Sequence, residues 1–341
     1  MVRYSALVPA AGTGTRLRPI TFTRPKPLVY VAGRPILGHI LDHLAGVVED
    51  VTVVVGHHAD KVIAYCEHAW GDRFTFHFAH QRELLGLGHA VLAGRGHVPT
   101  GGLIVTLGDE IFGVPYQRML GAHAANSPCA ASVGIKRVPD PRNYGVVELA
   151  ADGRVLDLVE KPETPRSEHA LAGVYVFERA DDIFEAVDAL IQADARTRGE
   201  FQLTDALRHM VKGGAVIRTF PIEVWYDCGR PDMLLDVNRR LLDASPPGSL
   251  PTAGAVLEGA VLVPPVAIEG RCRIERSVLG PHVSIGDGTR VEGSVISDCI
   301  VGEGCEVVDV VLRGSVLADR VVVRGRSQRM TVGEQTHMTM E

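Results

Sequence analysis

The stretch that decides the fold is Leu7-Val-Pro-Ala-Ala-Gly-Thr-Gly-Thr-Arg-Leu-Arg-Pro-Ile-Thr21, followed by Arg24-Pro-Lys-Pro-Leu28. Its first residues have the apolar character of the end of a buried strand. We expect Gly12 and Gly14 to turn the backbone with positive φ and to let it approach a ligand closely. The exposed N–H groups of such a turn would face an anion. A polyphosphate site is one interpretation of this loop, and an ordinary turn after a strand is the other.

Two common phosphate-binding motifs do not fit the loop. A P-loop needs Lys-Ser/Thr directly after its last glycine, whereas Thr15-Arg16 stands there. The dinucleotide-binding fingerprint needs a third glycine near the position of Leu17. Arg16 and Lys26 still bring positive charge to the loop, so the search for a metal site and a second phosphate clamp is justified.

The composition limits the class of protein. The chain has 341 residues, enough for two domains, and a formal charge of −6, which disfavours nucleic acid as a partner. The six cysteines show neither a CxxC pair nor metal-ligand spacing, as expected for free thiols in a reducing cytosol. Met1 leads almost directly into the first strand, and no apolar run is long enough to cross a bilayer. We therefore expect a cytoplasmic protein with small-molecule substrates and no membrane partner.

Up to about residue 240, apolar runs alternate with helix-like segments. This pattern is typical of a doubly wound, mostly parallel sheet with helices on both faces, whose ligands bind at the carboxyl ends of the strands. The predicted strands are 51–55, 74–78, 103–107, 130–135, 171–177 and 215–221, and the predicted helices are 35–44, 87–95, 117–125, 182–192, 203–212 and 231–242.

The second part of the chain has a different period. Residues 244–251 have the composition of a linker, and apolar residues then recur every five or six positions from Leu262 onward. Such a hexapeptide repeat predicts a parallel β-helix, with an irregular β-sandwich as the alternative. One rung consists of three short strands, so four inward residues should stack: Ile274, Val291, Val307 and Val323. We expect domains at 1–243 and 252–341, with Met330–Glu341 as a terminal cap.

Two aspartates follow apolar runs in similar settings. Asp109 comes after the strand at 103–107, and Asp227 lies in Trp225-Tyr-Asp-Cys-Gly229. A pair of carboxylates at the edge of a sheet suits Mg²⁺, which takes one or two carboxylates together with phosphate oxygens. Each aspartate alone could equally cap a turn.

A sugar-phosphate site is the functional interpretation of Glu160-Lys161, with a carboxylate for hydroxyls beside an ammonium for phosphate; a solvated strand end is the alternative. Gly145 lies in the predicted hairpin partner of this strand and leaves room for a ligand. The Gln81 amide could pair with a base edge, near the glycine N–H groups at Gly86. His89 follows at a helix start, where a polar cap is the expected role.

These motifs, taken in order, resemble the sugar-1-phosphate nucleotidyltransferases, and within them the long-form glucose-1-phosphate thymidylyltransferases, which carry a C-terminal left-handed β-helix. The resemblance covers nearly the whole chain. It rests on Gly12-Thr-Gly-Thr-Arg-Leu-Arg-Pro19, Pro25-Lys-Pro-Leu28, Gln81 with Gly86-Leu-Gly-His-Ala90, Leu107-Gly-Asp109, Tyr144-Gly145, Glu160-Lys-Pro162, Gly199-Glu-Phe-Gln-Leu-Thr-Asp205 and Asp227-Cys-Gly-Arg-Pro231.

The resemblance implies an assignment of roles. Arg16 and Lys26 would contact the triphosphate, and Asp109 and Asp227 would hold Mg²⁺ and complete the catalytic set. The implied sites are, for the nucleotide, Ala10, Ala11, Gly12, Thr13, Gly14, Thr15, Arg16, Gln81 and Gly86, and, for the sugar and its phosphate, Gly145, Glu160, Lys161, Gly173 and Arg198. The implied reaction joins dTTP and glucose 1-phosphate into dTDP-glucose with release of pyrophosphate, in a homo-oligomer.

Alternatives stay open at this point. UTP with glucose 1-phosphate and GTP with mannose 1-phosphate would use the same chemistry, and a regulatory subunit without catalysis would keep only binding. Acyl transfer on the β-helix would need a base, for which His282 is the obvious candidate there. The chain departs from the family pattern at two places: Glu110 replaces the usual Asn, which bears on the sugar, and Ala10-Ala11 replaces a glycine pair.

Overall fold

The computed structural model describes residues 2–246 and 254–325, and the chain divides into two compact units, Met1–Val237 and Asn238–Glu341. Helix α7 (Pro231–Ala244) is continuous across this division. The expected domain limits, 1–243 and 252–341, therefore remain a proposal. Most of the predicted linker and the whole of the predicted cap Met330–Glu341 lie outside the described residues.

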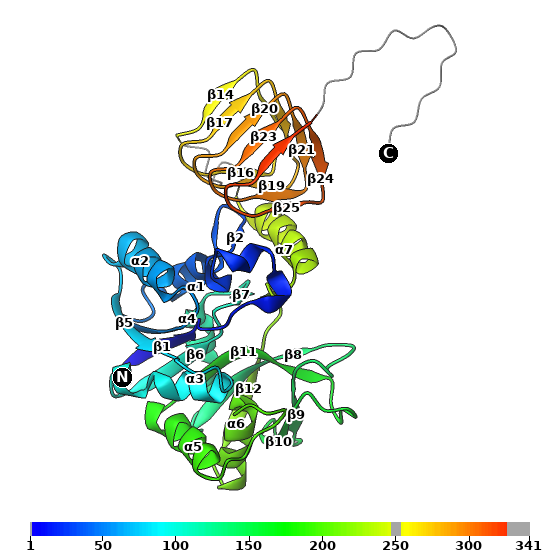
Figure 1. Ribbon diagram of the computed structural model, residues 1–341. Helices are drawn as coiled ribbons and strands as arrows, with labels where there is room; N and C mark the ends of the chain where they lie inside the picture. Colours follow the sequence, from blue (N-terminus) through cyan, green and yellow to red (C-terminus); the bar gives the residue numbers. More distant parts are fainter. Residues whose placement is uncertain (1, 247–253, 326–341) are drawn as a thin grey trace, which may run out of the picture. The chain divides into compact units, whose positions relative to one another are not determined.

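The first unit is built on one nine-stranded sheet with a path of β10-β9-β11-β6-β1-β4-β5 (Figure 1). Four neighbouring strands, β6, β1, β4 and β5, are parallel, and β11 runs antiparallel to β6. β8 pairs with β11 and with β12. The strands are β1 (Tyr4–Pro9), β4 (Asp50–Val55), β5 (Thr75–His80), β6 (Gly102–Thr106), β8 (Ala131–Arg137), β9 (Gly145–Leu149), β10 (Val155–Glu160), β11 (His169–Phe177) and β12 (Ile217–Pro221).

Helices lie on both faces of this sheet, as predicted. α3, α5 and α6 share one hydrophobic core with strand residues such as Leu7, Val105 and Tyr175, whereas Figure 1 shows α1 and α2 on the other side of the sheet. Alternate residues of a strand face opposite sides of the sheet. Because helices cover both sides, nearly all residues of β1 and β6 are apolar and buried. The helices are α1 (Ile36–Leu44), α2 (Ala59–Trp70), α3 (Leu87–Ala93), α4 (Tyr116–Ala125), α5 (Ala180–Gln192) and α6 (Leu203–Lys212).

Sequence reasoning missed α2, although its buried residues Val62, Cys66 and Trp70 follow one another at a spacing of four. Further apolar residues, Ile63, Ala64 and Ala69, lie between the buried ones, so apolar residues are not confined to one face and the period is obscured. Short elements were also missed: β2 (Tyr30–Val31) and β3 (Arg34–Pro35) form a hairpin, and β7 (Glu110–Phe112) pairs antiparallel with β13 (Trp225–Asp227). Such two- and three-residue strands carry too few residues to show a period.

The second unit contains the predicted left-handed parallel β-helix. The four inward residues stack as expected, because Ile274, Val291, Val307 and Val323 are direct partners from rung to rung. Its three sheets run in the orders β14-β17-β20-β23-β26, β15-β18-β21-β24 and β16-β19-β22-β25. The strands are β14 (Val256–Glu258), β15 (Val261–Leu262), β16 (Val266–Ile268), β17 (Arg273–Glu275), β18 (Val278–Leu279), β19 (Val283–Ile285), β20 (Arg290–Glu292), β21 (Val295–Ser297), β22 (Cys299–Val301), β23 (Glu306–Val308), β24 (Val311–Arg313), β25 (Val316–Leu317) and β26 (Val322–Arg324).

The three faces of the coil differ in chemistry. The face that starts with β14 carries a ladder of paired charges, in which Arg290 contacts both Glu292 and Glu306. The face that starts with β16 is covered by the end of α7, where the Ser284 hydroxyl donates to Asn238 Oδ1 at 2.6 Å. The face that starts with β15 presents a ladder of outward valines, which we call the valine ladder: Val261, Val278, Val295 and Val311.

Candidate active site

The loop after β1 is stabilised by its own side chains. Gly14 has φ 62°, and the Thr21 hydroxyl donates to its carbonyl at 2.8 Å. A Cβ at Gly14 would lie only 2.9 Å from Thr21 Cγ2, so both its conformation and its packing require glycine. The expectation of positive φ was wrong for Gly12, which borders open space, since a Cβ there would meet no heavy atom within 4 Å. Gly12 therefore keeps the space beside the loop open and does not form a left-handed turn.

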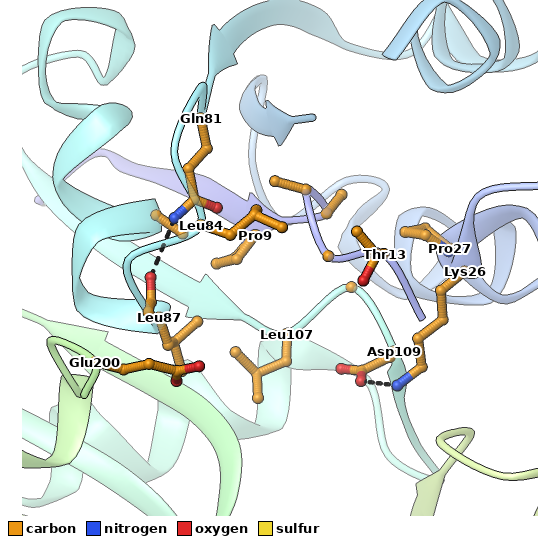
Figure 2. Close-up of a pocket in the computed structure, with 16 residues that line it drawn as sticks. Pro9, Thr13, Lys26, Pro27, Gln81, Leu84, Leu87, Leu107, Asp109 and Glu200 are labelled. Carbon is orange, nitrogen blue, oxygen red and sulfur yellow. Dashed lines mark hydrogen bonds and ion pairs between the residues drawn. The ribbon is translucent and has the colours of Figure 1, made fainter. Parts of the chain in front are cut away.

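The loop forms one wall of a cavity of about 350 Å³ at the carboxyl end of the sheet (Figure 2). Lys26 and Asp109 lie on one side of it, and Gln81 lies on the other. The lining residues are Pro9, Ala10, Ala11, Gly12, Thr13, Lys26, Pro27, Gln81, Leu84, Gly86, Leu87, Ala90, Leu107, Gly108, Asp109 and Glu200.

A second cavity of about 780 Å³ shares four lining residues with the first, Leu87, Leu107, Asp109 and Glu200. The two cavities therefore adjoin at Asp109. The other residues that line the second cavity are Arg16, Glu110, Asn143, Tyr144, Gly145, Glu160, Lys161, Leu171, Gly173, Tyr175, Gln202, Thr204, Trp225, Asp227, Arg230 and Met233.

Most residues singled out from the sequence line these cavities. Arg16 lines the second cavity and Lys26, the other predicted triphosphate contact, lines the first, and Asp109 lines both. Three are not among the lining residues: Gly14 and Thr15 lie at the end of the loop, and Arg198 donates through Nη2 to the Lys161 carbonyl at 2.9 Å.

Asp109 and Asp227 are brought together by the pairing of β7 with β13. Asp227 lies directly opposite Glu110 in this pairing, and the Cys228 N–H donates to the Asp109 carbonyl at 3.1 Å. Asp227 Oδ1 accepts the Gly229 N–H at 2.7 Å, and Lys26 forms an ion pair with Asp109. Residues from distant parts of the chain thus meet at one point.

The electrostatics of this point fit a divalent cation. Burial raises the pKa of Asp227, and repulsion from the Asp109 carboxylate raises it further. Burial alone would lower the pKa of Lys26, but the carboxylates of Asp109, Asp227 and Glu110 raise it overall. The described residues contain no cluster of three or more His, Cys, Asp or Glu side chains arranged for a metal. A cation here would therefore rely on two carboxylates and on ligand oxygens, which is the usual pattern for Mg²⁺.

The Glu160–Lys161 pair has the geometry of a clamp. Lys161 has φ 42°, and this turn places its Nζ 3.2 Å from Glu160 Oε1, although adjacent residues of a strand point to opposite faces. The Thr204 hydroxyl donates to Glu160 Oε2 at 2.7 Å. A Cβ on Gly145 would lie 2.8 Å from Thr204 Oγ1, so this glycine leaves room for the bond.

Sequence reasoning did not assign roles to several residues of the second cavity. The Trp225 indole N–H donates to Glu110, and its ring meets that of Tyr144 edge to face at 5.1 Å. Burial and the neighbouring aspartates raise the pKa of Glu110 well above its ordinary value. Gln202 Nε2 donates to Glu200 at 3.0 Å. The motif 199–205 was the signal for the last pair, but single residues within it could not be ranked without the fold.

Comparison with known proteins identifies the class of enzyme. Residues 5–244 match the family model described as nucleotidyl transferase. The chain belongs to the nucleotidyl transferase family. It is 38% identical over 333 residues to the glucose-1-phosphate thymidylyltransferase of Streptomyces griseus, covering 92% of this chain and 88% of the relative. The Streptomyces antibioticus enzyme of the same name is 34% identical over 343 residues, covering 98% and 93%.

Other relatives match a smaller share of the chain. The bifunctional protein GlmU of Methanocaldococcus jannaschii is 35% identical over 238 residues, or 70% of this chain and 54% of the relative. A solved structure of UDP-glucose pyrophosphorylase complexed with UDP-glucose aligns with a TM-score of 0.61 and 26% identity over 72% of this chain and 100% of that chain. The predicted family, enzyme class and fold class are confirmed. Among the described residues, none of the helices is long and apolar enough to cross a membrane.

Proposed function

We propose that this nucleotidyl transferase joins dTTP and glucose 1-phosphate into dTDP-glucose, with release of pyrophosphate. An oxygen of the sugar phosphate forms a bond to the α-phosphorus of the nucleotide, and the bond from that phosphorus to the pyrophosphate oxygen breaks. The attacking group is already an anion, so the protein need not remove a proton. Alignment and charge neutralisation are then the main contributions to catalysis.

The observation that carries this proposal is the pair of adjoining cavities that share Asp109. One cavity combines the glycine loop with Gln81, as a nucleotide requires. The other contains the Glu160–Lys161 clamp, as a sugar phosphate requires. Two substrates bound in this way would meet beside the aspartates, where the reacting phosphates need positive charge.

Each group has a part in this scheme. Lys26 and Arg16 would bind the triphosphate and the departing pyrophosphate, and Asp109 and Asp227 would hold Mg²⁺, which neutralises phosphate charge when bound. Glu160, Gly145 and Gly173 would contact the sugar. Lys161 would bind its phosphate, and the Arg198 bond to the Lys161 carbonyl would hold that residue in place.

The test is pyrophosphate release measured with four nucleotides, dTTP, UTP, GTP and ATP, against three sugar phosphates, the 1-phosphates of glucose, mannose and galactose. We expect the largest kcat/KM for dTTP with glucose 1-phosphate. A larger value for UTP or for mannose 1-phosphate would keep the reaction and replace the substrate. No pyrophosphate release with any pair would overturn the proposed function.

We also propose that the protein is a homo-oligomer, assembled through the valine ladder of the coil. Val261, Val278, Val295 and Val311 are partners from rung to rung and point outward, and Val311 is 78% exposed. The face that starts with β14 carries paired charges, and the face that starts with β16 lies beneath the end of α7. The complementary surface is therefore the uncharged valine ladder of a second copy of the chain. Val311→Lys should lower the mass found by light scattering, and Val322→Lys on the charged face should not.

A cytoplasmic location is proposed on the state of the thiols. All six cysteines are free, and five of them are buried. Proteins of this kind are typical of reducing compartments. Labelling of thiols in cell fractions would test the location, and recovery of the protein with intermolecular disulfides from an oxidising compartment would contradict it.

A further inference from the structure

Gln81 is held rigidly at the rim of the first cavity. It follows β5, its backbone N–H donates to the Val55 carbonyl at 2.9 Å, and the residue is 6% exposed. A side chain fixed in this way presents a constant set of donors and acceptors to a ligand. Which amide atom faces the cavity therefore decides what a ligand must offer there.

The amide nitrogen of Gln81 is already used within the protein. It lies 3.2 Å from the Gly86 carbonyl oxygen and 3.1 Å from His89 Nδ1. A carbonyl can only accept, so the amide atom beside Gly86 must be the NH₂ group. The same NH₂ group then donates to His89 Nδ1, which leaves the imidazole proton on Nε2. Gly86 and His89 thus take up both donors of the amide.

The Gln81 carbonyl oxygen is consequently the atom left for a ligand. Figure 2 shows the amide nitrogen on its dashed bond and the oxygen turned toward the cavity, near Leu84. The Gly86 carbonyl accepts both from Gln81 and from the Ala90 N–H at 3.1 Å, so it has no lone pair to offer. This side of the cavity therefore presents an acceptor, and a bound base must present a donor to it.

We infer that His89 is a positioning residue that sets the class of base by holding the Gln81 amide in one orientation. This inference rests on the proposed function, in which the first cavity binds the nucleotide. Thymine and uracil carry a ring N–H at N3, and guanine carries one at N1, so each can donate to the Gln81 oxygen. In the same position, cytosine N3 and adenine N1 are acceptors and would leave two acceptors facing each other, so these bases could reach the Gln81 oxygen only in a shifted pose that presents the exocyclic amino group.

The test compares His89→Leu, which removes the acceptor for the Gln81 NH₂ group, with His89→Asn, whose side-chain oxygen can replace it. Equilibrium binding of dTTP and dCTP is measured by titration calorimetry, and kcat/KM is measured with both nucleotides in the full chain. We expect the preference for dTTP over dCTP to fall about tenfold in His89→Leu, because the Gln81 amide is then free to turn its NH₂ group toward the base. His89→Asn should keep most of the preference, and KM for the sugar phosphate should stay within about twofold in both.

Three results would overturn the inference: an unchanged preference in His89→Leu, an equal loss in both variants, or a wild-type protein that binds dCTP as tightly as dTTP. Matching melting temperatures for the variants and the wild type guard against a loss of folding. Failure of the proposed function looks different. In that case dTTP would bind in preference to dCTP but no pyrophosphate would be released, and the binding ratios of the variants would still decide the role of His89.

Discussion

The cavities of the first unit and the coil of the second unit reach their order by opposite routes. In the coil, Ile274, Val291 and Val307 are completely buried, and each has its equivalent in the next rung as a neighbour. Around the cavities the polar groups form individual pairs of different kinds: Lys26 pairs with Asp109, and Thr204 donates to Glu160. A repeated packing contact stabilises the coil, whereas the chemistry at the cavities depends on polar residues that are each placed individually. Changes in the two regions should therefore have separable effects.

The largest effect should come from the aspartates. Asp109→Asn and Asp227→Asn should each lower kcat by about 10²–10³, because each removes a negative charge that would hold the cation, and the cation neutralises the reacting phosphates. Pyrophosphate release at several Mg²⁺ concentrations measures this, with Asp72→Asn, at an exposed position outside both cavities, as the matched control. Near-normal Mg²⁺-dependent rates in both variants would show that the pair does not hold the metal.

The next effect concerns the coil. Val291→Ala removes two fully buried methyl groups, and should lower the free energy of unfolding of the second unit by about 2–3 kcal/mol while leaving kcat/KM unchanged. Chemical denaturation of the full chain and substrate kinetics measure the two quantities. Val322→Ala, the same substitution at an exposed position outside the valine ladder, should have little effect on either. If kcat/KM fell together with the free energy of unfolding, the coil and the cavities would not be independent of each other.

Acid should act on the first unit through His39. Its Nε2 donates to the Val31 carbonyl at 2.9 Å, and burial lowers the pKa of His39 to about 4. Below its ordinary pKa of 6.5 the unfolded state gains a proton that the folded state refuses, so stability should fall between about pH 6.5 and 4 and stay constant above. The loss is on the order of 3 kcal/mol. His39→Gln should flatten this part of the pH profile of unfolding, and a profile identical to that of the wild type would rule out His39 as the cause.

The smallest effect should be that of the clamp. Lys161→Ala should raise KM for the sugar phosphate about tenfold, and KM for the nucleotide far less, since the side chain is partly exposed and one charge-assisted bond is lost. Steady-state kinetics with each substrate varied in turn measure the difference, and Lys212→Ala on α6 provides a lysine outside both cavities as control. Equal changes in both KM values would remove the distinction between the two cavities.

The residues that sequence reasoning placed correctly are those with a period or a motif. The coil was predicted to the level of stacking partners, because an interval of five or six residues specifies which side chains face inward. Helix α6, Leu203–Lys212, was predicted to the residue. Helix α2 was missed because apolar residues also lie between its buried ones and obscure the period, and the β7–β13 pairing was missed because a strand of three residues shows no alternation.

By itself, the sequence determined the two-part architecture, the family and a list of candidate residues, since these depend on local periods and on motifs that stay together in the chain. Only the tertiary structure decided how the candidates combine. It set Asp227 opposite Glu110, turned Lys161 back toward Glu160, and left the carbonyl oxygen of Gln81 facing the cavity by means of His89. Contacts between residues far apart in sequence depend on strand register and on backbone turns, and neither can be deduced from a linear pattern of residue types.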